Sequence, residues 1–301
     1  MAYTNANWPA LPFEAWEATR ATLHMWTQIV GKVRLAQSPY LNHWWQVPLY
    51  VSARGLTTSA IPYREQSFEV EFDLIEHVLS IRKSDGATRT LPLAPKSVAA
   101  FHAEFMAALR ALGIEVRIWT MPSEIPDPIA FDRDTVHASY DPHAVAPFWR
   151  ILVSVDAVLK EFRGRFIGKA SPVHFFWGSF DLAVTRFSGR RAPPMPQADS
   201  ITREGYSHEV SSVGWWPGDA SARYPAFYAY AAPEPEGFGK APVRPAAAFY
   251  DTKASQFRLK YDDVRTATSP REALLDFCQS TYEAAATLGQ WNRSELERNA
   301  G

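Results

Sequence analysis

Several common sequence signals are scarce in this chain of 301 residues. It has one cysteine, Cys278, which excludes an internal disulfide and a cysteine-rich zinc module. No apolar run approaches the roughly 20 residues that are needed to cross a bilayer. The N-terminal stretch MAYTNANWPALPFEAW has neither the basic nor the apolar region of a signal peptide. We therefore expect a soluble, cytoplasmic protein that does not enter a membrane.

Charge and motifs give equally few functional signals. The chain has 31 Lys and Arg against 32 Asp and Glu, a net charge of −1, and its basic residues are scattered along the sequence. We therefore expect no binding to nucleic acid, which requires a basic patch or stripe. The phosphate loop, the dinucleotide glycine motif, the serine-hydrolase elbow, the zinc-protease motif and the calcium loop are all absent. The sequence thus leaves the cofactor unknown, and it leaves the oligomeric state open.

Aromatic residues and prolines are abundant. The chain has 11 Trp, 12 Tyr and 18 Phe, or 14% aromatics, and 23 Pro. Aromatic side chains build ordinary cores, and they also line ligand pockets. Prolines interrupt regular structure and favour turns. This composition predicts a fold rich in strands and loops.

Hydrophobic periodicity predicts four helices and eight strands. The helices are expected over residues 13–35, 97–113, 141–166 and 270–289, and Ser97 and Gly113 are the expected ends of the second. The strands are expected over residues 43–53, 67–75, 77–86, 114–122, 173–187, 206–214, 223–231 and 255–261. Helices and strands separate along the chain, which predicts an α+β fold with mainly antiparallel sheets and packed helices.

The order of elements suggests two similar halves in one compact unit. We expect an N-terminal α+β half over residues 1–122, a linker loop over 123–142 and a C-terminal α+β half over 143–301. The stretches GKVRLAQSPYLNHWWQVPLYV (31–51) and GKASPVHFFWGSFDLAV (168–184) share Gly-Lys, Ser-Pro and a histidine before aromatics. An internal duplication explains this likeness, and coincidence between two aromatic strands is the alternative. A duplication predicts matching places for His43 and His174 in two pseudo-twofold α-β-β-β-α halves.

Six stretches spread over nearly the whole chain have a distinctive amino-acid sequence. They are WPALP (8–12), TLHMWTQIVGKVRL (22–35), NHWWQVPLYVSARGLTT (42–58), SPVHFFWGSFDLAVTRFSGR (171–190), YSHEVSSVGWWPG (206–218) and YPAFYAYAAPEPEGF (224–238). Together they resemble an uncharacterised bacterial family, domain of unknown function 5996. The resemblance implies a stand-alone cytoplasmic protein, and it brings no activity, cofactor or substrate with it.

The stretch SPVHFFWGSFDLAVTRFSGR holds the densest set of polar and aromatic side chains. Alternate residues of a strand share a face, so His174 is expected with Leu182 and Val184 on a core face. Asp181 falls on the opposite, mixed face with Ser179 and Thr185. A buried carboxylate needs a cation or hydrogen-bond donors, and this makes Asp181 either a structural anchor or a group that acts on a ligand.

Histidines and carboxylates elsewhere could share a pocket with this stretch. His174 and His208 are the candidate acids or bases, with Asp181 and Glu209 as carboxylates that orient them or the ligand. His43, Trp45, Trp177, Arg186 and Tyr206 are the candidate substrate-binding residues, and Arg186 would anchor an anionic group. His43, His174 and His208 or Glu209 have the residue types of a metal site but no ligand spacing, so no metal ligand is assigned. Structural histidines in a core are the alternative.

Two classes of function fit these residues. The first is acid/base chemistry on a small, partly apolar molecule in an aromatic pocket that holds His, carboxylate and Arg groups. The second is a small-molecule-binding protein with the same pocket and no reaction. The acidic loop SEIPDPIAFDRDTVHASYDP (123–142) is expected to be solvated, with a lid or a cation site as the alternative. Convergence of the polar residues on one cavity would favour an enzyme.

Overall fold

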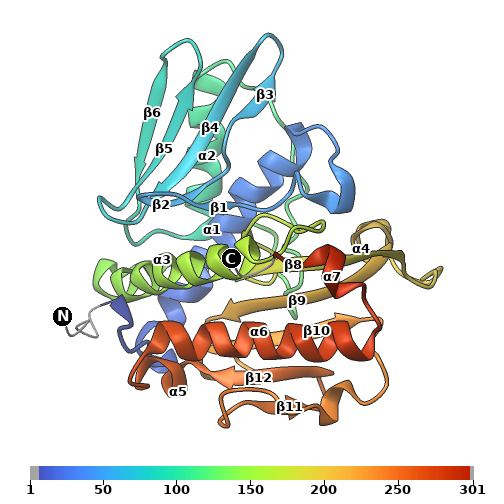
Figure 1. Ribbon diagram of the computed structural model, residues 1–301. Helices are drawn as coiled ribbons and strands as arrows, with labels where there is room; N and C mark the ends of the chain where they lie inside the picture. Colours follow the sequence, from blue (N-terminus) through green and yellow to red (C-terminus); the bar gives the residue numbers. More distant parts are fainter. Residues whose placement is uncertain (1–6, 299–301) are drawn as a thin grey trace.

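A long helix, α1 (Phe13–Gln37), runs through the middle of the molecule. The computed structural model describes residues 7–298. In Figure 1, α1 crosses from the lower part of the molecule to the upper part behind another helix, α3 (Pro142–Gly164). Trp26 of α1 stacks on Phe101, and Trp16 packs on Phe148 of α3. Because α1 is buried along most of its length, its side chains contact both parts of the molecule.

The first sheet lies at the top of Figure 1 and is antiparallel throughout. Its strand order is β1-β2-β4-β5-β6, with β3 paired to β4. The strands are β1 (Tyr50–Val51), β2 (Gly55–Thr57), β3 (Ile61–Tyr63), β4 (Gln66–Asp73), β5 (Val78–Lys83) and β6 (Thr88–Pro92). Helix α2 (Val98–Ala111) follows, and the Ser97 side chain caps its first turn by accepting a hydrogen bond from Ala100 N at 3.1 Å.

The second sheet is also antiparallel, in the order β11-β12-β10-β9-β8-β7. Its strands are β7 (His174–Phe176), β8 (Asp181–Arg191), β9 (His208–Trp216), β10 (Ala226–Ala232), β11 (Phe249–Asp251) and β12 (Gln256–Lys260). Helices α3 and α6 (Pro270–Leu288) cover one face of this sheet (Figure 1). The short elements are η2 (Asn42–Trp44), α4 (Ser200–Gly205), η3 (Phe238–Lys240), α5 (Tyr261–Arg265) and α7 (Arg293–Leu296).

A single antiparallel bridge connects the two sheets. Leu49 N donates to Phe175 O at 2.9 Å, and Phe175 N donates to Leu49 O at 2.8 Å. The segment before β1 therefore continues the second sheet beyond β7. The α+β class with antiparallel sheets and packed helices is confirmed, with six strands in each sheet.

The structure corrects three of the expected strands. The single strand expected over 173–187 is a hairpin of β7 and β8, which turns at Trp177–Phe180, and Phe180 adopts φ +60° there. Residues 43–49 form the turn η2 and an extended segment, because His43 and Trp44 both have positive φ. Residues 114–122 pair with no strand, although Ile114 is buried. Two carboxylates of β4, Glu71 and Asp73, are buried beside Arg82 and Arg54.

The predicted halves and the duplication remain predictions. His43 lies in η2 and His174 in β7, so the two histidines have different backbone settings. The long loop expected over 123–142 is present. Residues 1–6 and 299–301, the outer ends of the expected halves, lie outside the described residues.

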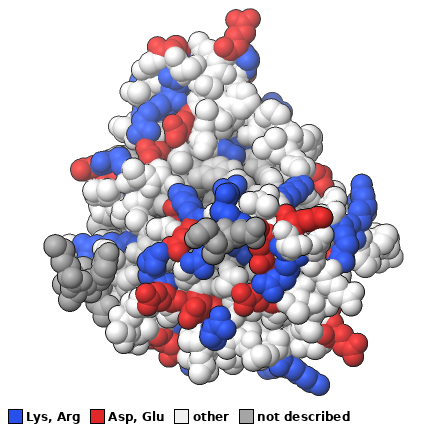
Figure 2. Space-filling view, viewed as in Figure 1, with Lys and Arg blue, Asp and Glu red and all other residues white. Residues whose placement is uncertain are grey.

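Charges of both signs are mixed over the face seen in Figure 2, and no field of one sign covers it. Within residues 7–298, no helix is long and apolar enough to span a membrane.

The contact between Gly31 of α1 and Trp177 gives the first prediction. A Cβ atom at Gly31 would lie 2.3 Å from the Trp177 indole ring. We expect G31A to lower the free energy of unfolding by about 1–3 kcal/mol, because the indole must move within a packed interior. Urea unfolding measures this, with G164A as the matched control. A Cβ at Gly164 meets nothing within 4 Å, so G164A should be neutral or stabilising by about 0.5–1 kcal/mol. Equal effects of the two substitutions would contradict the packing account.

Candidate functional site

The two faces of the second sheet have different roles. Side chains of β8 at Leu182, Val184 and Arg186 point to α3 and α6, and the alternate ones line a cavity of about 730 Å³ on the other face. The floor comes from four strands: Asp181, Ala183, Thr185 and Phe187 of β8, Val210, Ser212 and Trp216 of β9, Ala226, Tyr228 and Tyr230 of β10, and Gln256 and Arg258 of β12. The segments that close it hold His43–Trp45, Ser123–Glu124, Trp177–Ser179, Ile201–Tyr206 and Asp219–Ser221.

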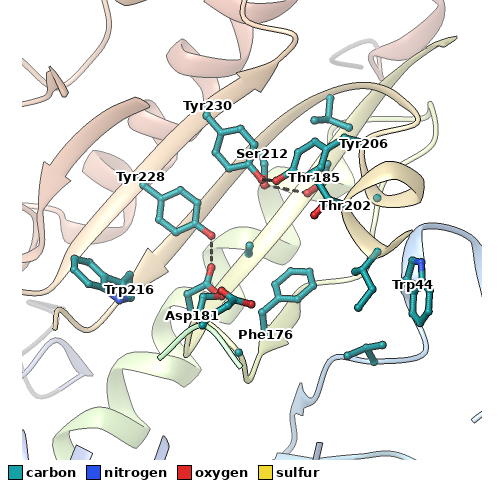
Figure 3. A pocket seen from close by; sticks show the side chains of 18 of the residues that line it. Trp44, Phe176, Asp181, Thr185, Thr202, Tyr206, Ser212, Trp216, Tyr228 and Tyr230 are labelled. Atoms are coloured by element: carbon teal, nitrogen blue, oxygen red, sulfur yellow. Dashed lines mark hydrogen bonds between the residues drawn. The ribbon is translucent and has the colours of Figure 1, made fainter. Parts of the chain in front are cut away.

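Asp181 occupies one end of the cavity, at the start of β8. It is 5% exposed, and both of its carboxyl oxygens accept hydrogen bonds from hydroxyl groups. Ser179 Oγ donates to Oδ1 at 2.5 Å, and the Tyr228 hydroxyl donates to Oδ2 (Figure 3). Burial raises the pKa of Asp181, while these two hydrogen bonds act in the opposite direction.

Glu124 is the second carboxyl at this end. Its backbone has φ +58°, in the left-handed region that glutamate rarely adopts. The carboxyl lies against Gly178, where an added Cβ would be 2.4 Å from Glu124 Oε1. Burial and the neighbouring charge of Asp181 raise the pKa of Glu124. An ionised Asp181 therefore disfavours the ionised form of Glu124.

Polar side chains of α1 hold the two segments that carry these acids. His24 Nε2 lies 3.0 and 2.8 Å from the carbonyl oxygens of Trp177 and Gly178, so this nitrogen carries the proton. Gln28 receives a hydrogen bond from Ser123 N at 2.7 Å and donates one to Ser123 O at 2.9 Å. Burial lowers the pKa of His24 to about 3, and the ring is a neutral donor at ordinary pH.

Hydroxyl groups form the middle of the cavity. Tyr206 and Tyr230 share a hydrogen bond of 2.8 Å, and Thr185 Oγ1 lies 3.0 Å from Ser212 Oγ (Figure 3). Burial raises the pKa of Tyr206 and, more strongly, that of Tyr230. These phenols are therefore protonated and can donate or accept hydrogen bonds. They could orient the polar groups of a ligand whose apolar parts contact the rings.

The far end of the cavity is formed by His43, whose ring packs on Phe187 at a centroid distance of 4.6 Å. Its Nδ1 lies 3.0 and 3.1 Å from the carbonyl oxygens of Glu204 and Gly205, so this nitrogen carries the proton. The other nitrogen, Nε2, lies 2.6 Å from Lys169 Nζ. Burial, together with the charge of Lys169, lowers the pKa of His43. His43 is thus held as a neutral ring between backbone and lysine.

The predicted site residues divide between the cavity and its surroundings. His43, Trp45, Trp177, Asp181 and Tyr206 line the cavity. The structure does not bring the remaining four, His174, Arg186, His208 and Glu209, to its wall.

His174 is 1% exposed beneath the rings of Trp45 and Tyr50. Neither of its ring nitrogens has a hydrogen-bond partner among the described residues. His208 lies near the His43 end, where its Nδ1 contacts Ser207 Oγ at 3.0 Å. Its ring centroid is 5.6 Å from that of His43.

Arg186 and Glu209 lie on the helix-covered face and cannot reach the cavity. The Arg186 guanidinium lies 3.5 Å from the Phe162 ring centroid and 4.3 Å from that of Tyr282. Glu209 pairs with Arg190 at 2.7 Å near the end of α6. Strand alternation separates both residues from Asp181 and its neighbours.

Sequence reasoning did not single out Glu124 or Tyr228. Glu124 was one acid among several in the 123–142 loop, and only the Gln28 contact from α1 directs it to the cavity. Tyr228 could have been found, because it alternates with Tyr230 in YPAFYAYAA and so shares a face with it. Over residues 7–298, no group of three or more His, Cys, Asp or Glu side chains is arranged to hold a metal ion.

Comparison with known proteins identifies the family. The chain belongs to the family of unknown function DUF5996, whose model matches residues 8–298. No curated protein and no solved structure matches the chain.

The setting of His174 gives the second prediction. Burial, with the charges of Arg34 and Arg163, lowers its pKa to about 3, so the ring is neutral and unpaired when folded. We expect H174L to raise the free energy of unfolding by about 1 kcal/mol at neutral pH, because it removes a buried polar group without a partner. Urea unfolding measures the change.

The pH dependence of the same variant is a second readout. The unfolded chain binds a proton at His174 near pH 6.5 and the folded chain only near pH 3. The wild type therefore loses stability as pH falls through this window, and H174L should lose less. A destabilised H174L with unchanged pH dependence would show that the ring nitrogens have partners.

The raised pKa values of Asp181 and Glu124 give the third prediction. A carboxyl whose folded pKa is raised binds more protons when folded, so stability falls as pH rises from about 4 toward the folded pKa. We expect E124Q and D181N not to lose stability in this way. The difference in melting temperature between each variant and the wild type should therefore grow with pH. Thermal unfolding from acidic to neutral pH measures it. An advantage that does not change with pH in either variant would contradict the burial of these charges.

Proposed function

We propose that the cavity on the second sheet binds a small, partly apolar molecule, that Glu124 exchanges a proton with it and that Asp181 orients it. The observation that carries this proposal is the pair of carboxyls at one end of an aromatic cavity. Aromatic walls with a few convergent polar groups are typical of small-molecule sites. Perturbed carboxyls in such a cavity are the usual groups of acid/base chemistry.

The two acids differ in their freedom to move. Asp181 is fixed by hydroxyl donors at both oxygens. Glu124 accepts no hydrogen bond from another described residue, and its carboxyl lies against Gly178, which has no side chain. Glu124 is therefore the group suited to take a proton from the ligand or return it. Asp181 is suited to orient the ligand and to tune Glu124 through its charge.

Backbone strain around the cavity supports a functional site. His43, Trp44, Glu124 and Phe180 all have φ between +58° and +60° without being glycine. Each such residue costs about 1–3 kcal/mol unless its surroundings hold it. The first three line the cavity, and the fourth precedes Asp181 in the turn. Strain of this kind is common where side chains must be aimed at a ligand.

Binding without a reaction is the second candidate function. The two hydrogen bonds to Asp181 favour its ionised form and suit a group that only orients a ligand. The candidates differ in what happens to the bound molecule. If the protein is an enzyme, incubation of the wild type with the molecule recovered from its cavity converts that molecule into a product. The E124Q variant then still binds the molecule but does not convert it. A binding protein returns the molecule unaltered in both cases.

A cavity-filling substitution tests the proposal. Thr185 lies in the middle of the floor and is partly exposed to the cavity. We expect T185F to abolish the small-molecule mass that native mass spectrometry detects on the freshly purified wild type, because the phenyl ring occupies the ligand's place. T185V is the matched control, since it removes the hydrogen bond to Ser212 without filling the space. Equal amounts of bound small molecule on the two variants would contradict the proposed site. A wild type on which no small molecule is detected would also contradict it.

A further inference from the structure

Asp181 differs from every other buried acid of the described residues in having no basic side chain beside it. Four acids are buried elsewhere: Glu71, Asp73 and Asp156 form ion pairs with Arg82, Arg54 and Lys160, and Asp134 contacts the ring of His137. Asp181 is as deeply buried, but only hydroxyl groups contact it. The charge of a buried carboxylate is costly without a counter-ion.

Glu124 is a second acid at the cavity wall. Its side chain is exposed rather than buried, and it too forms no ion pair within residues 7–298. The one arginine of the cavity wall, Arg258, is paired with Asp251 at 3.1 Å. The backbone of Arg258 lies on β12, three strands from β8, or about 14 Å at the usual strand spacing, and its guanidinium lies 5.9 Å from the ring centroid of Trp216. No side chain of the cavity wall therefore neutralises the two carboxyls.

Aromatic rings surround the acids on the cavity side. Trp177, Phe176 and Trp216 line the same end of the cavity as Asp181. Figure 3 shows Phe176 and Trp216 on either side of the Tyr228–Asp181 hydrogen bond. Ring faces attract cations, and a carboxylate with aromatic neighbours is a common binding site for organic ammonium groups. Within residues 7–298, no third His, Cys, Asp or Glu side chain joins these two carboxyls in an arrangement that could hold a metal ion.

We infer that the ligand carries a protonated amine that binds between Asp181 and Glu124, with its apolar part toward Thr185 and Phe187. This inference rests on the pocket function proposed above and specifies the chemical class of its ligand. The ammonium group takes the place that Lys or Arg occupies beside the buried acids Glu71, Asp73 and Asp156. The hydroxyls of Tyr206 and Tyr230 then contact polar groups further along the ligand.

A matched set of probes tests the inference on the full chain. 2-Phenylethylamine, 2-phenylethanol and 3-phenylpropanoate are of similar size and differ in charge. Isothermal titration calorimetry at neutral pH should give the amine an affinity at least about tenfold above that of the alcohol, with the carboxylate weakest. Amine binding should also release protons, measured in buffers of different ionisation enthalpy, because the ammonium favours the ionised carboxyls.

Variants assign the preference to the two acids. D181N and E124Q should each reduce the ratio of amine to alcohol affinity by about tenfold. E209Q removes an acid on the opposite face of the sheet and should leave the ratio unchanged. G178A leaves both charges in place but moves the Glu124 carboxyl, and it should give an intermediate ratio.

The outcomes separate the inference from the proposed function. Equal affinities for amine and alcohol that T185F abolishes would overturn the ammonium inference and leave the pocket function intact. Absence of amine binding at millimolar concentration would also overturn the inference. The proposed pocket function fails only if, in addition, native mass spectrometry detects no small molecule on the wild type.

Discussion

The fold depends on the hydrogen bonds between the side chains of one buried helix and the loops around it. An interior helix normally presents apolar side chains, because unpaired polar groups are costly there. Helix α1 instead buries His24, Gln28, Thr22 and Thr19, and each is paired with the backbone of a distant segment. These pairs fix the Trp177–Gly178 turn, Ser123 and the approach to α3. Replacing this polar face with apolar side chains would leave buried peptide groups without partners.

The candidate site follows from that arrangement. The turn after β7 and the loop before α3 are far apart in the sequence, and α1 holds both at the same end of the second sheet. Asp181 begins β8 directly after the turn, and Glu124 follows Ser123, so the two carboxyls meet at the cavity. The strained φ of Glu124 persists because Gln28 pairs with both backbone groups of its neighbour. The cavity acids lack cations, whereas the acids of the first sheet have them, and this contrast distinguishes a site for a ligand from structural ion pairs.

Local patterns were sufficient to predict some of these features. Period-2 alternation placed Asp181 with Ser179 and Thr185, and helix signals gave α1, α2, α3 and α6 nearly to their ends. Arg186 and Glu209 were named as site candidates with Asp181, but the structure places both on the face that the helices cover, and alternation alone does not tell which face that is. The position of Glu124 could not be predicted from the sequence, because it depends on the tertiary contact of Gln28 with the neighbouring residue Ser123. The strand expected over 114–122 did not form, since apolar alternation needs a neighbouring strand with which to pair.

The central claim is that Asp181 and Glu124 are two carboxyls whose counter-ion is the ligand. Carbon-detected NMR titration of the two side-chain carboxyls in the full chain tests it most directly, with D181N and E124Q to assign the signals. The account predicts pKa values above the ordinary range for both groups in the free protein, because Asp181 is buried and Glu124 is partly desolvated beside the charge of Asp181. It also predicts that both values fall when 2-phenylethylamine is added. Ordinary pKa values that the amine leaves unchanged would contradict it.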